Sequence, residues 1–260
     1  MSYLAKMLES ARTRLAEAKQ RVTVEALEQR LAGVDAPRSL RPALEGPQTD
    51  VAVIAEIKRA SPSGGVFNAN LSATETAVTY ARGGAAAISV LTEPEFFKGS
   101  LDDLTSARAA GLPVLRKDFI LDTWQVLESR AAGADALLLI VRALERRELE
   151  ALLAACRTLR MDALVEVYDE AEMTTALEAG ATIVGVNNRD LETFEVDHGR
   201  TAMLASLVPD AVMLVALSGV STRSDVEELV AAGAQAVLVG ESLVRAADPA
   251  AELRALRGES

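Results

Sequence analysis

Short apolar segments alternate with helix-like segments from residue 51 almost to the end of this chain, and the alternation repeats eight times. The apolar segments are mostly continuous runs, which is typical of parallel strands covered on both faces. Several helix-like segments end at a glycine, as helices commonly do. The predicted strands are residues 51–57, 86–91, 113–118, 135–141, 162–167, 182–187, 212–217 and 235–240. The predicted helices between and after them are residues 72–82, 101–110, 123–132, 144–159, 170–178, 198–207, 222–232 and 241–256.

Eight strand–helix units in succession predict a (β/α)8 barrel, the TIM barrel, and the 260 residues fit one such domain spanning 1–260. Residues 1–46 precede the first strand and form an N-terminal helical extension in this prediction. Helical spacing covers residues 2–33, with a second short pattern at 24–31, before Pro37 and Pro42 interrupt it. The alternative is a doubly wound open sheet, which is weaker because no GxGxxG motif follows the first strand.

The chain carries a net charge of −11, which argues against non-specific binding to nucleic acid or to an anionic membrane. No apolar run is long enough to span a bilayer, and the charged N-terminus has no signal-peptide core. We therefore expect a cytoplasmic protein. As a separate expectation, the protein is a monomer. The lone Cys156 lies at helical spacing and indicates a buried thiol, and the lone His198 has no partners for a metal site.

Polar side chains collect where the predicted strands end. Glu56 and Lys58 follow an apolar run and share a face with Ile54, a costly placement unless the two charges are paired or used. The alternative to a functional pair is an ordinary ion pair at the end of the strand. Residues 51–65 alone favour the two explanations about equally. Other strand ends add Lys117, Asp118, Glu166, Asn187, Asn188, Arg189, Ser218, Gly219, Gly240 and Glu241, whereas the strand beginnings carry no comparable set. Barrel active sites lie at the carboxyl ends of strands, so the convergence favours an active site.

Two glycine sites, Gly219 and Gly240, follow the seventh and eighth predicted strands and suit a phosphate cradle built from backbone N–H groups. Tight turns are the alternative role for both glycines. We favour the cradle because Lys58 and Ser61 offer further donors nearby. Phe96, Phe97 and Phe119 fall on other loops at the same end of the predicted barrel, where they either line a pocket for a flat ring or cover the barrel mouth.

Seven segments between residue 54 and residue 245 carry a match to a known family. They are IAEIKRASPSGG, LTEPEFFKGSLDDL, PVLRKDFILD, AGADALLLIV, ALVEV, GVNNRDLETFEVD and VLVGESLVR. Together, and in this order, they resemble the indole-3-glycerol-phosphate synthase family of tryptophan biosynthesis. The N-terminal extension is also similar to that of the family. The resemblance implies ring closure of a phosphorylated small molecule, 1-(2-carboxyphenylamino)-1-deoxyribulose 5-phosphate, with loss of CO₂ and water. It implies no cofactor and no metal.

The resemblance also implies catalytic roles. Closure places negative charge on the C2′ carbonyl oxygen, where a cationic acid is needed. Lys117 matches the general-acid lysine of the family, and Glu166 matches the catalytic glutamate usually given a base role. Glu56 and Lys58 match the first-strand pair, with Lys58 also near the phosphate. The division of acid and base roles among these four residues stays open.

The remaining matches concern binding. Asn187 and Arg189 match residues that hold the substrate hydroxyl and the anthranilate carboxylate, a group that suits a guanidinium fork. Ser218 is a further expected substrate contact. The phosphate site is matched by Ser61, Gly219, Gly240 and Glu241, and the pocket around the aromatic ring by Phe97, Phe119, Leu138 and Leu191.

One position departs from the family. The usual AESG after the seventh strand is here Ala216, Leu217, Ser218 and Gly219. By strand alternation Leu217 shares a face with Met213 and Val215 and should project into the substrate site. Either the glutamate is dispensable, or the chain is a diverged or engineered barrel with impaired or altered activity that retains phosphate-ligand binding. A phosphoribosylanthranilate isomerase lacks support, because its Cys/Asp acid–base pair has no counterpart beside the mid-helix Cys156.

Overall fold

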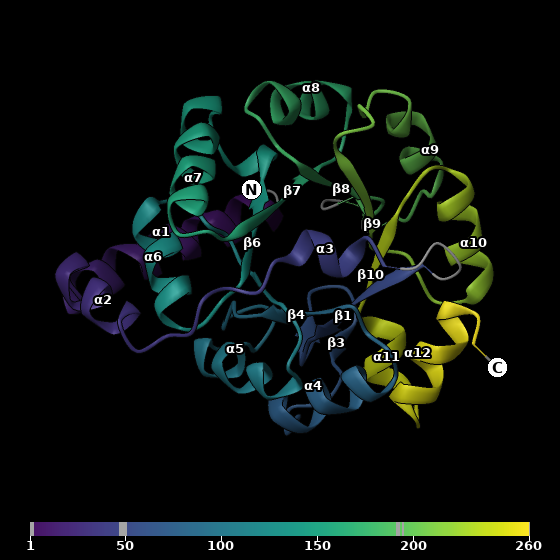
Figure 1. The fold of residues 1–260 in the computed structure, drawn as a ribbon, viewed down its shortest axis with the longest axis horizontal. Helices are drawn as coiled ribbons and strands as arrows, with labels where there is room; N and C mark the ends of the chain where they lie inside the picture. The colour runs from purple at the N-terminus through teal and green to yellow at the C-terminus, as the bar shows by residue number, and fades with distance from the viewer. Residues whose placement is uncertain (1–2, 47–50, 191–192, 194, 260) are drawn as a thin grey trace.

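The computed structural model describes residues 3–46, 51–190, 193 and 195–259. Eight parallel strands close into a barrel within this described part, in the order β1-β10-β9-β8-β7-β6-β5-β4 (Figure 1). The predicted (β/α)8 barrel is thus confirmed, and the open sheet is excluded. The barrel strands are β1 (Ala52–Ile57), β4 (Ala87–Leu91), β5 (Val114–Lys117), β6 (Ala136–Ile140), β7 (Asp162–Val167), β8 (Ile183–Asn187), β9 (Met213–Leu217) and β10 (Ala236–Val239).

Helices surround the strands, because each strand is followed by an amphipathic segment that buries its apolar face on the sheet (Figure 1). Ser72 caps the helix that follows β1, since its hydroxyl accepts the N–H of Glu75 at 3.3 Å. The helices are α4 (Ala73–Arg82), α5 (Leu101–Ala107), α6 (Thr123–Ala131), α7 (Arg146–Thr158), α8 (Glu170–Glu178), α9 (Gly199–Ala205), α10 (Arg223–Ala231), α11 (Glu241–Arg245) and α12 (Pro249–Arg257), with 3₁₀ turns at Arg108–Ala110 and Val141–Ala143. None of the described helices is long and apolar enough to cross a membrane.

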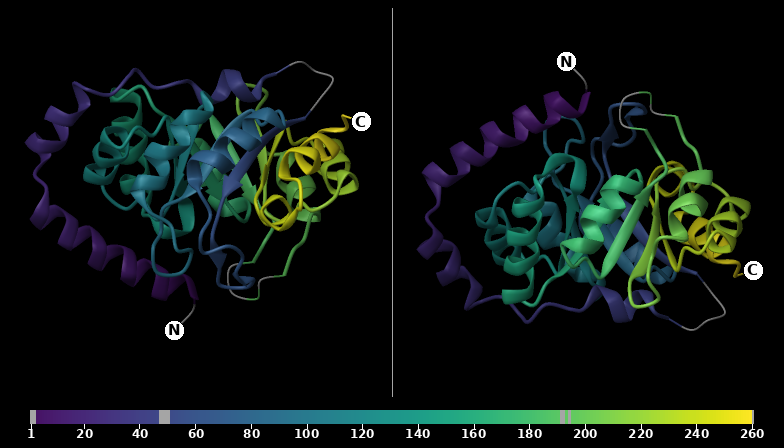
Figure 2. Two further views of the ribbon diagram at one scale, coloured as in Figure 1. Left: turned by 90° about the horizontal axis from the view of Figure 1, so that it is seen from below. Right: turned by 90° about the horizontal axis from the view of Figure 1, so that it is seen from above.

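The N-terminal extension runs from one end of the barrel to the other. It contains α1 (Tyr3–Arg21), α2 (Val24–Leu31) and α3 (Leu40–Leu44), and Figure 2 shows α1 and α3 on opposite sides of the barrel. Met7 of α1 and Leu40 and Leu44 of α3 belong to the same apolar cluster as the inward side chains of the strands. The extension therefore helps to close the barrel interior at both ends.

Helix α2 has the bounds of the second short pattern predicted at 24–31, and Thr23 caps it by accepting the N–H of Ala26. Three details differ from the predicted elements. Helix α3 was not predicted; Pro42 lies in its first turn, where a missing N–H costs nothing. Between the first predicted strand and the first predicted helix after it, where no element was predicted, lies a small hairpin of β2 (Ala60–Ser61) and β3 (Gly65–Val66). The last predicted helix is split, since Asp248 caps a new helix that begins at Pro249.

The strand register brings the polar strand ends to a similar level around the barrel mouth. Glu166 of β7 lies beside Ile140 of β6, and Asn187 of β8 lies beside Leu217 of β9. Lys117 of β5 lies beside Leu91 of β4. Side chains that are far apart in the sequence therefore meet at this end.

Candidate active site

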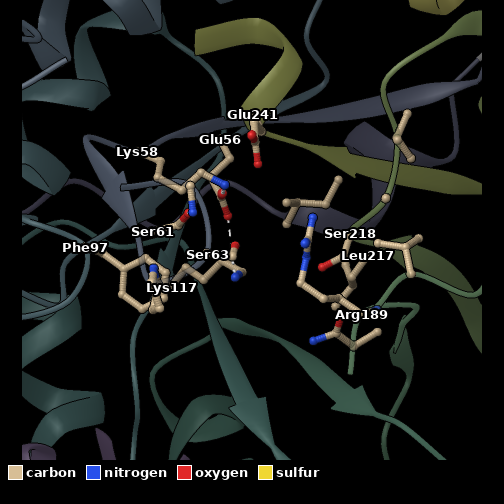
Figure 3. A pocket seen from close by; sticks show the side chains of 18 of the residues that line it. Glu56, Lys58, Ser61, Ser63, Phe97, Lys117, Arg189, Leu217, Ser218 and Glu241 are labelled. Carbon is tan, nitrogen blue, oxygen red and sulfur yellow. Dashed lines mark hydrogen bonds and ion pairs between the residues drawn. The ribbon is translucent and has the colours of Figure 1, made fainter. Parts of the chain in front are cut away.

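A pocket of about 640 Å³ opens at the carboxyl ends of the strands (Figure 3). Glu56, Lys58 and Ser61 lie on one side of it, across from Arg189, Leu217 and Ser218. Of the catalytic, substrate-binding and phosphate-binding residues proposed from the sequence, all but one line this pocket; the exception, Leu191, lies outside the described residues. Those that line it are Glu56, Lys58, Ser61, Phe97, Lys117, Phe119, Leu138, Glu166, Asn187, Arg189, Leu217, Ser218, Gly219, Gly240 and Glu241. Two other strand-end residues, Asp118 and Asn188, do not line it: Asp118 pairs with Arg116, and Asn188 accepts a hydrogen bond from Thr201.

One buried carboxylate joins two lysines. Glu56 points inward from β1, and Lys58 Nζ lies 3.0 Å from its Oε1, while Lys117 Nζ lies 3.5 Å from its Oε2. Gly240 leaves the space for this carboxylate, since a Cβ there would stand 2.5 Å from Glu56 Oε1. The three charges are therefore held at the pocket wall by the ends of β1 and β5.

The opposite charges of Glu56 and Lys117 each favour the ionised form of the other. Burial works against the ionised form of Glu56, but the ammonium groups of Lys58 and Lys117 outweigh it and lower the pKa of this carboxyl below its ordinary value. Burial likewise disfavours the Lys117 ammonium, yet Glu56 and then Glu166 raise its pKa above the ordinary lysine value. Lys117 is consequently protonated at neutral pH and can act as a proton donor.

A second polar chain crosses from β7 to β8. The buried Glu166 accepts a hydrogen bond at 3.0 Å from Asn187 Nδ2. Asn187 Oδ1 in turn accepts the N–H of Arg189 at 3.1 Å. Asn187 therefore orients the carboxylate of Glu166 and the backbone that carries the Arg189 guanidinium.

The two glycine sites and the β2–β3 hairpin also contribute to the pocket wall. After β9 the chain turns through two consecutive left-handed residues, Ser218 with φ of +64° and Gly219 with φ of +84°. A non-glycine residue in this region carries strain, which is often found at ligand sites. Ser61 accepts the N–H of Gly64 at 3.0 Å, and its hydroxyl hydrogen can still be donated to a ligand.

The remaining wall is apolar. Phe97, Phe119 and Leu138 line it, and Glu93 holds the loop of Phe97 by accepting that residue's N–H at 3.1 Å. Leu217 points inward, as predicted, and is buried in the interior cluster with Met213 and Val215. The position that the family usually gives to a carboxylate is therefore part of the apolar wall.

The pocket also contains residues that the sequence did not indicate. Met7 reaches it from the N-terminal extension, His198 from the start of α9 and Arg245 from α11. None of these belongs to a strand end, so the alternation of elements gave no signal for them. Cys156 lies buried within α7, and this burial raises the pKa of its thiol to about 12, which confirms a structural thiol.

Comparisons with known proteins place the chain among these barrels. Residues 4–256 match the family described as indole-3-glycerol phosphate synthase. The chain belongs to that family. The indole-3-glycerol phosphate synthase of Desulfosudis oleivorans is 53% identical over 211 residues, covering 80% of each chain. That of a Parafrankia species is 48% identical over 250 residues, covering 96% of this chain and 92% of its own. The family predicted from the sequence is thereby confirmed.

Two further similarities are less specific. A multifunctional tryptophan biosynthesis protein of Schizosaccharomyces pombe is 53% identical over 215 residues, which cover 80% of this chain and 28% of that longer protein. The crystal structure of 3-hexulose-6-phosphate synthase from Salmonella typhimurium superposes with a TM-score of 0.65 at 15% identity, covering 80% of this chain and 97% of its own. This second likeness concerns the fold alone. The comparisons do not favour a diverged barrel with another activity.

Proposed function

We propose that this chain is a carbon–carbon lyase that converts 1-(2-carboxyphenylamino)-1-deoxyribulose 5-phosphate into indole-3-glycerol phosphate, CO₂ and water. The observation that carries this proposal is the pairing of Lys117 with Glu56 at the wall of an apolar pocket, with Glu166 on the neighbouring side. This arrangement supplies a cationic acid and a separate carboxylate around a space lined by aromatic and aliphatic side chains.

The reaction needs only proton transfers and rearrangement of bonds within the substrate. The ring carbon that carries the carboxylate attacks C2′, and the carbonyl oxygen takes a proton from Lys117. The bond to the carboxylate then breaks, CO₂ leaves, and its electron pair returns to the ring. Finally the hydroxyl on C2′ takes a proton from the Lys58 ammonium and leaves as water, while Glu166 removes a proton from C1′. Solvent then returns protons to the two lysines and takes the proton from Glu166, which completes the cycle. Glu56 keeps Lys117 protonated and in place, as their separation of 3.5 Å indicates.

Binding of the substrate is divided between two parts of the pocket. The Arg189 guanidinium holds the anthranilate carboxylate, Asn187 holds a sugar hydroxyl, and the ring lies between the apolar side chains. At the other part, Ser61, Lys58 and the backbone at Gly219, Gly240 and Glu241 hold the phosphate. These assignments are supported by the position of every one of these residues on a single pocket.

Three expectations from the sequence stay predictions. They are a cytoplasmic location, a monomer, and one domain over residues 1–260 with 1–46 as its extension. Gel filtration with light scattering would test the monomer, and a second species at twice the chain mass would contradict it.

Steady-state formation of indole-3-glycerol phosphate, followed by indole fluorescence, tests the proposed function. We expect clear turnover by the unsubstituted chain, which would show that a glutamate at position 217 is not essential. Absence of turnover by a folded chain would overturn the proposal. Recovery of activity in Leu217→Glu would then identify a disabled synthase, and no recovery would indicate a barrel with another role.

A further inference from the structure

Tyr168 lies directly beyond β7, two residues after Glu166, and two arginines stack on its ring. The Arg200 guanidinium carbon lies 3.7 Å from the ring centroid, and that of Arg142 lies 4.2 Å from it. Arg142 is itself held by Glu172, whose Oε1 lies 2.8 Å from Arg142 Nε. Guanidinium groups stack well on aromatic faces, so the ring is fixed from two directions.

Arg200 also ties this ring to the end of β8. From α9, its Nη1 donates to the carbonyl oxygens of Asn187 and Asn188 at 3.3 and 3.0 Å. Its Nη2 donates to the Tyr168 hydroxyl at 2.8 Å. One guanidinium therefore joins the strand end that carries Glu166 to the strand end that carries Asn187 and Arg189.

The Tyr168 hydroxyl extends the same connection into the loop after β8, because it donates a hydrogen bond to the Asp190 carboxylate. Asp190 adjoins Arg189 and shapes the loop: its Oδ1 accepts the N–H of Thr193 at 2.9 Å, and its own N–H donates to Glu195 at 2.9 Å. Arg189 pairs with Val196 across this loop. The backbone on both sides of Arg189 is thus held from outside the pocket.

Tyr168, Arg142 and Arg200 do not line the main pocket. The first two instead line a separate small cavity together with Glu166 and Asn187, on the other side of those residues from the substrate space. They can affect the reaction only through the groups that they support.

We propose that Arg200, stacked on Tyr168, is a positioning residue that sets the direction of Arg189 and Asn187 and thereby the affinity for the carboxylated ring of the substrate. The inference rests on the proposed function, because it takes Arg189 as the carboxylate clamp. A guanidinium suits this role because it stays charged, stacks as a plane on the ring, and donates in fixed directions to three oxygens. A lysine ammonium also has three donors, but it has no plane to stack on the ring.

The test measures kcat and KM of Arg200→Ala and Arg200→Lys. Arg146→Ala is the matched control, because Arg146 is an ion-paired arginine on the surface of α7. Arg200→Ala should raise KM about tenfold while kcat changes much less, as expected for lost ground-state binding. Arg200→Lys should recover only part of the loss, and Arg146→Ala should change neither constant. Inhibition by inorganic phosphate should stay unchanged, since the phosphate groups lie elsewhere in the pocket.

Combining Arg200→Ala with Arg189→Ala separates positioning from general loosening of the fold. If Arg200 acts through Arg189, its removal should raise KM little further once the clamp is absent. If the fold-increases in KM of the two single variants multiply in the double variant, or if KM is unchanged in Arg200→Ala alone, the inference is overturned while the proposed function stays intact. Absence of turnover by the folded, unsubstituted chain would instead overturn the proposed function, and this inference with it.

Tyr168 provides an independent check of the same connection. Tyr168→Phe keeps the stacked ring and loses only the hydroxyl, so it should raise KM less than Tyr168→Leu, which loses both. Equal effects of the two substitutions would show that the stacked ring does not contribute. Thermal unfolding of each variant, compared with Arg146→Ala, would reveal whether a raised KM merely reflects lost stability.

Discussion

Buried carboxylates occur at both ends of this barrel, and their partners differ. At the amino end, Asp135 is fully buried and accepts the N–H groups of Arg38 and Val114 at 3.0 and 2.9 Å. Arg108 adds a third hydrogen bond at 3.2 Å. At the mouth, Glu56 faces two lysine ammonium groups, and its Oε2 has no hydrogen-bond partner among the described residues.

The difference separates a structural carboxylate from one that can take part in chemistry. Backbone N–H groups cannot move away as side chains can, so the hydrogen bonds of Asp135 hold the N-terminal extension against two strands permanently. Lysine side chains can move toward a ligand, so the partners of Glu56 remain available to a substrate. The prediction that strand beginnings carry no comparable polar set missed Asp135 and also Asp162, which accepts the N–H of Leu40 at 2.6 Å.

The largest effect should come from Lys117→Ala at the mouth. Loss of the proton donor should lower kcat about 10³-fold, in the range for general acid catalysis, while the melting temperature stays near that of the unsubstituted chain. Indole fluorescence measures kcat, and calorimetry measures the melting temperature. Lys6→Ala, on the exposed face of α1, is the matched control. Turnover by Lys117→Ala close to normal would remove the general-acid assignment.

Asp135→Ala should show the opposite pattern at the amino end. It leaves two backbone N–H groups and the Arg108 guanidinium without their acceptor, which should lower the free energy of unfolding by about 3 kcal/mol. Chemical denaturation measures this loss, and kcat per folded molecule should be unchanged. Asp135→Asn keeps one acceptor and should lose less. A large fall in kcat with normal stability would contradict a purely structural role for Asp135.

Glu56→Gln should change the pH dependence as well as the rate. Without the anion, burial of the Lys117 ammonium is no longer outweighed, so the pKa of Lys117 falls. The alkaline limb of the kcat profile should therefore move to lower pH, and kcat near neutrality should fall about 10²-fold. An alkaline limb that stays in place would show that Glu56 does not control Lys117.

The smallest effect should come from Leu217→Glu. Lys58 and Lys117 already share one carboxylate, so we expect turnover to change by less than about tenfold. Burying a new carboxylate should cost about 1–3 kcal/mol of stability. Leu217→Met, which conserves volume, is the control. A much larger gain in kcat would show that the unsubstituted chain lacks a needed group.

Much of the barrel could be predicted because each strand and helix carries its own periodic signal. The hairpin of β2 and β3 and the short helix α3 could not, since each is only a few residues long and depends on distant partners. Asp162 at the start of β7, for example, caps α3 by accepting the N–H groups of Leu40 and Arg41. At the site, residues at strand ends were predictable, whereas Met7 and Arg245 reach the pocket only through the three-dimensional path of their helices.

The one histidine of this chain gives the site a built-in spectroscopic reporter. His198 lines the pocket with Nε2 3.1 Å from the Gly219 carbonyl oxygen and Nδ1 3.2 Å from the Glu228 carboxylate. Because no other imidazole is present, a single set of ring ¹H and ¹⁵N resonances would require no assignment. Titration with a phosphorylated ligand while these resonances are followed would report occupancy beside Gly219 without a label or a substitution.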